Sequence, residues 1–180
     1  MPDAPAPSRP TVAHPTAPPT RVAPAVLDEV RRLYAALDDE VRSLGVGCWV
    51  HGNCCDFTRV DHRLYASSVE LAYVRAKHSP PPKRAAQEAA QNSAGNAAAA
   101  APSTNEALCP FWTNGRCGER EGRPLGCRTY FCDPRFRLPL QDLYERYLQK
   151  LRAIATQHSI PWSYEPFVAA MRAPASDESA

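Results

Sequence analysis

Apolar residues recur at helical spacing in the first part of the chain. Steps of three and four residues separate the following positions: Leu27, Val30, Tyr34, Leu37, Val41 and Leu44. Such spacing places side chains along one face of an α-helix. Pro24 suits the first helical turn, and Gly45 suits the stop because glycine accepts the left-handed conformation at a helix end. The pattern predicts a helix from Ala25 to Leu44.

This apolar stripe is compatible with two arrangements. It could form the seam of a coiled-coil dimer, or it could be one face of the core of a domain. The stripe covers about three heptads, which is barely enough for a stable coiled coil. We therefore expect residues 25–44 to contribute one face of the core.

Two further stretches are predicted to be helical. Ser67 and Glu70 have the spacing of a capping box, in which each side chain satisfies an early backbone amide, so a helix is expected over Ser68–Lys77. A third helix is expected over Leu140–Thr156, where apolar residues again fall on one face. Residues 164–171 could add a short last helix, and no strand pattern is strong enough to predict a sheet.

Three segments have a composition that does not support a packed structure. Residues 1–24 are rich in Pro and Ala, residues 79–105 in Pro, Ala and small polar residues, and residues 173–180 are small and polar. Segments this poor in large apolar side chains cannot offset the entropy lost on ordering. We predict a disordered N-terminal tail, a low-complexity insert and a disordered C-terminal tail around one domain at 25–172.

The remaining chain is short for a folded domain. Roughly 120 residues are enough for one domain with a modest core. A bound metal ion would help to stabilise a core of this size. The predicted fold class is therefore mainly α: a small metal-stabilised α-helical domain with irregular cysteine-rich loops.

Charge and hydropathy argue against two classes of partner. The formal net charge is +2 and no long Lys/Arg block occurs, so we expect no nucleic-acid partner. The chain has no run of about 20 apolar residues and no apolar leader, so we expect a cytoplasmic protein without a membrane partner. Thiols stay reduced in the cytoplasm, and an odd count of seven cysteines leaves one over in any complete disulfide scheme. The sequence identifies no protein partner.

The cysteines fall in two separate segments. The first reads Cys48-x2-His51-x2-Cys54, with Cys55 directly after it, and the second contains Cys109, Cys117, Cys127 and Cys132. Two-residue gaps are typical of metal knuckles and iron–sulfur loops, because a tight turn brings such side chains to one ion. The predicted metal ligands are the seven cysteines and His51.

Two questions about these cysteines remain: whether they are ligands at all, and how many metal sites they form. A single cysteine is most often a small buried apolar residue, but seven confined to two segments rich in turn residues do not fit that role. Adjacent side chains point in different directions, so Cys54 and Cys55 need not bind the same ion. One site and two sites both fit the pattern. The other four histidines have no ligand spacing and are assigned no role.

The second segment, CPFWTNGRCGEREGRPLGCRTYFCD, resembles the C-terminal signature of the YkgJ-type cysteine-cluster family, whose domain is described as zinc- or iron-chelating. The likeness includes Arg123-Pro124 and Cys127-Arg128. The family's first segment has the pattern Cys-x2-Cys-x2-Cys-Cys, and here His51 stands at the second position. The resemblance covers residues 33–171 apart from the insert.

The resemblance implies a protein that chelates zinc or iron through a Cys/His cluster, with its biochemical role otherwise unassigned. Zinc accepts three cysteines and a histidine, whereas an iron–sulfur cluster normally takes four cysteines, so His51 favours zinc. An iron–sulfur redox protein is one alternative. Another is an accessory protein-modifying, methyltransferase-like enzyme, because a related cluster occurs in flagellin lysine-N-methylases. We favour a non-enzymatic metal-binding protein, since the chain has no dinucleotide fingerprint, phosphate loop or nucleophile elbow.

Residues beside the predicted ligands suggest supporting roles. The guanidinium of Arg128 could neutralise nearby thiolates and donate hydrogen bonds to sulfur, or it could form a salt bridge at the surface. Aromatic residues interleave the ligands and are expected to exclude water: Trp49, Phe111, Trp112, Tyr130 and Phe131.

Overall fold

The computed structural model describes residues 22–48, 53–57, 63–78, 108–113 and 115–173. The predicted N-terminal tail up to residue 21, the insert at 79–105 and the C-terminal tail from residue 174 lie outside these ranges, as do Trp49 and His51. The described residues are mainly helical, with two very small sheets, so the fold class is mainly α as predicted.

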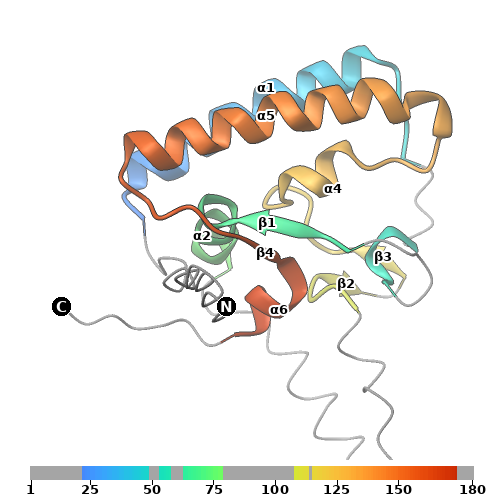
Figure 1. Ribbon diagram of the computed structural model, residues 1–180. Helices are drawn as coiled ribbons and strands as arrows, with labels where there is room; N and C mark the ends of the chain where they lie inside the picture. The colour runs from blue at the N-terminus through green and yellow to red at the C-terminus, as the bar shows by residue number, and fades with distance from the viewer. Residues whose placement is uncertain (1–21, 49–52, 58–62, 79–107, 114, 174–180) are drawn as a thin grey trace, which may run out of the picture.

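Two long helices build the main core. Helix α1 spans Pro24–Ser43 and α5 spans Arg137–Gln157. Figure 1 shows them side by side along one face of the molecule, and their facing side chains form one buried cluster that includes Tyr34, Leu37 and Tyr147. The apolar stripe of α1 is therefore a core face of this chain, as expected, rather than a seam for a second copy.

The ends of both helices follow from local sequence. Gly45 has a φ of 71°, the left-handed conformation expected just past the end of α1. Helix α5 begins three residues before the predicted Leu140. Pro139 is tolerated there because the first turn of a helix needs no backbone N–H donor at that position. The prediction of both helices is confirmed, with small shifts at their ends.

Helix α2 (Ser68–Lys77) is buried more completely than its sequence suggests. The capping box is present: the Ser67 hydroxyl accepts from the Glu70 amide, and the Glu70 carboxylate accepts from the Ser67 amide. All residues from Ser68 to Val74 are buried. The helix contacts α1, α5 and α6, so it has no solvent-facing side in its first two turns.

Two short antiparallel ladders were not predicted. Strand β1 (Tyr65–Ser67) pairs with β4 (Tyr164–Pro166), and β2 (Trp112–Thr113) pairs with β3 (Arg116–Cys117). Strands of two or three residues are too short to show alternation in the sequence. The last helix, α6, consequently covers only Phe167–Arg172, because β4 takes the first residues of the stretch predicted as helical.

The cysteine-rich segments contain more regular structure than expected. Residues Asn53–Cys55 form a 3-10 turn, and Leu125–Thr129 form the short helix α4. A further 3-10 turn, Pro134–Phe136, leads into α5. In Figure 1, α4 and the β1–β4 ladder lie beneath α1 and α5, and the β2–β3 ladder and α6 lie farthest from them. No helix among the described residues is long and apolar enough to cross a membrane.

Candidate functional site

The two cysteine segments, separated by the insert in sequence, meet in space. An isolated antiparallel bridge pairs Asp56 with Leu108. The amide of Cys109 donates to the carbonyl of Cys55 over 3.0 Å. Cys117 is then brought alongside by the β2–β3 ladder, in which it pairs with Trp112. Backbone pairing therefore holds thiols from both segments in one place.

Four thiols form the cluster, and Cys55 is its centre. The thiol of Cys55 lies within hydrogen-bonding reach of those of Cys54, Cys109 and Cys117. The sulfur atoms of Cys54 and Cys55 are 4.0 Å apart. Cys55 and Cys109 are buried, whereas Cys54 and Cys117 are partly exposed. Phe111, as expected from the sequence, is buried beside them in the same apolar cluster. We call these four residues the thiol cluster.

The hydrogen bonds within the thiol cluster set its electrostatics. Hydrogen bonding with Cys55, whose single proton serves one neighbour at a time, lowers the pKa of Cys54 and of Cys117 to about 6 and also lowers the pKa of Cys109. The same bonds raise the pKa of Cys55, which keeps its proton. Because a metal binds thiolate rather than thiol, the cluster already favours the ionised ligand form at neutral pH.

The other predicted ligands lie around the thiol cluster rather than in it. Burial, followed by negative charge on Cys109 and Cys117, raises the pKa of Cys127 well above its usual value. Cys48 and Cys132 are exposed. Although Cys132 is exposed, the desolvation of its thiol by neighbouring atoms and the negative charges of Cys54 and Cys48 raise its pKa. His51 is outside the described residues, so its place relative to the thiols is not part of this geometry.

Within the described ranges, no three His, Cys, Asp or Glu side chains are arranged as a group that could hold a metal ion. In a tetrahedral zinc site with Zn–S bonds of about 2.3 Å, the sulfurs are about 3.8 Å apart. The Cys54–Cys55 separation of 4.0 Å is close to that value. The donor set is suitable, but it is not closed around an ion.

Of the two roles considered for Arg128, the structure shows a salt bridge, although the arginine itself is buried. It is buried, and its guanidinium forms an ion pair of 2.6 Å with Asp38 of α1. It also donates to the carbonyls of Arg123 (2.8 Å) and Glu121, and its guanidinium carbon lies 4.1 Å from the centre of the Tyr34 ring. Arg128 therefore attaches the loop before α4 to the main core, and none of these contacts is with a sulfur atom.

The guanidinium groups that act on the thiols are different ones. Arg123 contributes to the lowered pKa of Cys54, and Arg123 and Arg120 contribute to that of Cys117. Neither arginine was predicted to lie beside sulfur. Their position between two predicted ligands, Cys117 and Cys127, was the available signal.

A histidine with no assigned role lies close to the cluster. His78 Nε2 is 2.6 Å from the carboxylate of Glu119, and its ring centre is 4.6 Å from that of Phe111. The backbone carbonyl of Glu119 in turn lies 2.7 Å from Cys117 Sγ and accepts from this thiol when it is protonated. The end of α2 is thereby connected to the loop that carries Cys117. Sequence spacing could not reveal this contact, because the insert separates the two residues.

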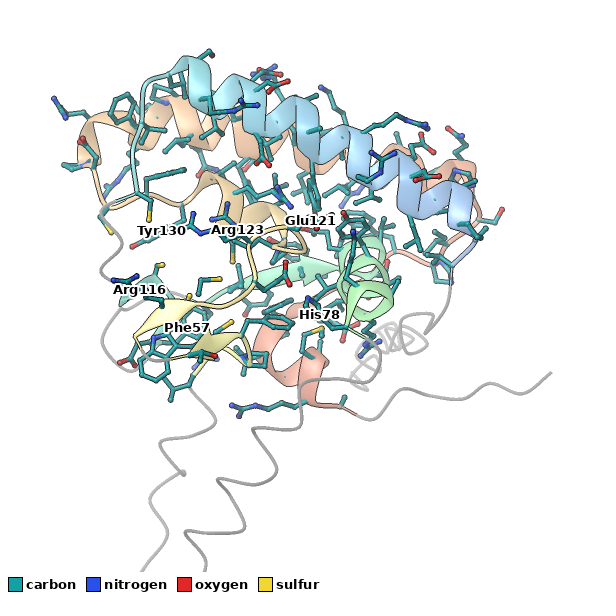
Figure 2. All side chains as sticks on the ribbon, turned by 180° about the vertical axis from the view of Figure 1, so that it is seen from behind. Phe57, His78, Arg116, Glu121, Arg123 and Tyr130 are labelled. Carbon is teal, nitrogen blue, oxygen red and sulfur yellow. The ribbon has the colours of Figure 1, made fainter. Side chains whose placement is uncertain are left out.

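A cavity of about 810 Å³ opens beside the thiol cluster. Six of the seven cysteines line it, all except Cys109. Five arginines line it as well: Arg63, Arg116, Arg120, Arg123 and Arg137. Figure 2 shows the sulfur atoms between Arg123 and Tyr130 on one side and Arg116 and Phe57 on the other.

Comparisons with known proteins identify no relative of this chain. No protein-family model matches the chain, and neither the curated proteins nor the solved structures give a significant match. The resemblance to the YkgJ-type family therefore stays a prediction from its motifs.

Differential alkylation of the reduced, metal-free protein is expected to distinguish the thiols at pH 7. With a pKa of about 6, Cys54 and Cys117 are about nine-tenths thiolate at that pH, whereas the raised pKa keeps Cys127 protonated. Iodoacetamide should label the first two at least about tenfold faster than Cys127, and lowering the pH to 5 should slow them about tenfold. Peptide mass spectrometry measures each rate.

Unfolded protein in urea is the control for this experiment, because all three thiols should then react alike. Similar rates for Cys54, Cys117 and Cys127 in the folded protein would contradict the pKa order.

Proposed function

We propose that this chain is a metal-binding protein that chelates zinc or iron through the thiol cluster of Cys54, Cys55, Cys109 and Cys117. The observation that supports it is the meeting of four thiols, two from each cysteine segment, with a pKa of about 6 at Cys54 and Cys117. Ordinary buried cysteines have raised pKa values, because an apolar environment disfavours the thiolate.

Metal binding would resolve the charge problem of the cluster. Loss of protons from several adjacent thiols creates mutual repulsion, which the nearby Arg123 offsets only in part. A divalent ion at the centre would place positive charge directly between the sulfurs and would displace the proton of Cys55. The proposal requires the four side chains to turn from pairwise contacts toward one point.

The other predicted metal ligands have a secondary place in the proposal. Cys127, Cys48, Cys132 and His51 could complete a second site or exchange with members of the thiol cluster. A metal in the thiol cluster would tie the β2–β3 ladder to the 3-10 turn at Asn53–Cys55, which is the stabilising role expected from the small size of the domain. Cys54, Cys55, Cys109 and Cys117 form no disulfide, and a reducing compartment such as the cytoplasm would keep them reduced.

An iron–sulfur centre is the second candidate, and one observation favours it. The thiol cluster contains four cysteines and needs no histidine, which is the usual ligand set of such centres. In that case the protein would transfer electrons rather than hold zinc. A methyltransferase-like activity has no comparable support among the described residues.

Titration of the reduced, metal-free full chain with Co²⁺ under anaerobic conditions tests the proposal. Tetrahedral thiolate coordination gives Co²⁺ intense visible absorption, and we expect these bands to saturate stoichiometrically and to disappear when Zn²⁺ is added. Only the weak absorption of hydrated Co²⁺, with no effect of Zn²⁺, would overturn the proposed function.

A further inference from the structure

The charged side chains that line the cavity beside the thiol cluster are mostly positive. Its arginines come from separate parts of the fold: one precedes β1, one lies on β3, two lie in the loop before α4, and one begins α5. Among the described residues, the only carboxylate that lines it is Asp133, which already accepts from Arg135 over 2.6 Å. No carboxylate among the described residues forms an ion pair with Arg63, Arg116, Arg120 or Arg137.

The thiol cluster does not account for this charge. Arg123 and Arg120 act on the thiols, and Arg63, Arg116 and Arg137 add three more positive charges around the same cavity. A cluster of four thiolates around one divalent ion would carry a net charge of about −2, which is less than five guanidinium groups supply. The cavity keeps an excess of positive charge with or without metal.

Exposed tyrosines form another part of the cavity wall. Tyr65 and Tyr164 stack with ring centres 5.5 Å apart and an angle of 16° between the rings, although both side chains are exposed. Tyr130 is 43% exposed. Three of the four exposed large apolar side chains in the described part of the chain thus line this one cavity. Exposed aromatic faces gathered at one concavity are typical of a ligand site.

We propose that this cavity binds a small organic anion, a molecule with a phosphate or carboxylate group attached to a flat apolar part. The planar guanidinium fork matches the two oxygens of either anionic group, and the tyrosine rings offer a surface for stacking. The volume of about 810 Å³ lies within the range of about 300–1,000 Å³ for small-molecule sites. This site goes beyond metal binding and does not depend on it.

The test is calorimetric titration of the full chain with three probes. The first, 1-naphthyl phosphate, has both the ring and the anion, whereas inorganic phosphate has only the anion and 1-naphthol only the ring. We expect saturable binding of 1-naphthyl phosphate, at least about tenfold tighter than that of either fragment. A parallel titration with 1-naphthoate shows whether phosphate or carboxylate is preferred.

Variants locate the binding in the cavity. The double variant Arg63→Gln/Arg120→Gln should bind 1-naphthyl phosphate at least about tenfold more weakly, because two charge-assisted contacts are lost. Arg32→Gln removes one positive charge from an exposed position on α1 outside the cavity and should bind like the wild type. Tyr65→Leu should weaken the binding of 1-naphthyl phosphate but not the binding of inorganic phosphate.

Three results would overturn the inference: no saturable binding of 1-naphthyl phosphate, equal affinity for either fragment, or equal affinity of the double variant and Arg32→Gln. Metal content measured in the same samples keeps the two proposals apart. Probe binding by a wild-type protein that binds no metal would contradict only the proposed function, and metal without probe binding would contradict only the anion site.

Discussion

Replacing Glu70 by leucine is expected to lower the free energy of unfolding by about 3–5 kcal/mol, because one buried carboxylate joins three helices. Its Oε1 accepts from the Tyr34 hydroxyl of α1 (3.0 Å) and from the Leu125 amide of α4 (2.7 Å). Its Oε2 accepts from the amide and the hydroxyl of Ser67, both over 2.8 Å. Leucine fills the same space but leaves these buried donors without an acceptor.

Urea unfolding followed by circular dichroism measures this effect, with two variants for comparison. Glu70→Gln keeps one acceptor oxygen and should lose less stability than Glu70→Leu. Glu145→Leu changes an exposed carboxylate on α5 and should stay within about 0.5 kcal/mol of the wild type. A loss below about 1 kcal/mol for Glu70→Leu would show that the three helices do not depend on this carboxylate.

Replacing Cys55 by serine is expected to weaken metal binding at least about 100-fold, since a hydroxyl is a poor substitute for a thiolate and several kcal/mol of ligand energy are lost. Cys55 is the position with the largest effect because it contacts the other three thiols of the cluster. Competition with a chromophoric chelator under anaerobic conditions measures the affinity.

Cys132→Ser is the matched comparison, because it makes the same chemical change at an exposed cysteine outside the thiol cluster. We expect it to keep most of the wild-type affinity. Equal losses in the two variants would mean that the ligand set is not the thiol cluster, and unchanged affinity in Cys55→Ser would remove Cys55 from it.

Helices α1, α2 and α5 could be predicted because their signals are local. Periodic apolar positions, a capping box and a terminal glycine each act within a few residues, and the structure has helices at these places. Helix α4 and the two ladders could not be predicted, since elements of two to five residues are stabilised by their neighbours rather than by their own pattern.

The same limit applies to single side chains. The capping box predicted the contact between Glu70 and Ser67, but the contacts of Glu70 with Tyr34 and Leu125 depend on how helices pack. Arg128 follows a cysteine in sequence, which suggested a role at sulfur, yet its ion pair is with Asp38 on another helix. Tertiary packing decided both roles.

For the cysteines, the sequence predicted which residues are candidates but not how they divide. Spacing alone left one site and two sites open for the adjacent Cys54 and Cys55. The structure brings both into the thiol cluster, with Cys109 and Cys117, and leaves Cys48 and Cys132 exposed. The arginine-lined cavity was not predicted. Arg63 precedes the insert in sequence and Arg137 follows it, and only the fold brings both to the cavity.

Metal analysis of the full-length protein, purified without oxygen and without added metal, tests the central claim most directly. Elemental analysis and the visible spectrum should be recorded on the same sample. We predict close to one or two metal ions per chain, colourless if zinc is bound and brown if an iron–sulfur centre is present. A protein that is correctly folded by circular dichroism yet contains neither zinc nor iron, and that takes up neither on reconstitution, would contradict a metal site in the thiol cluster.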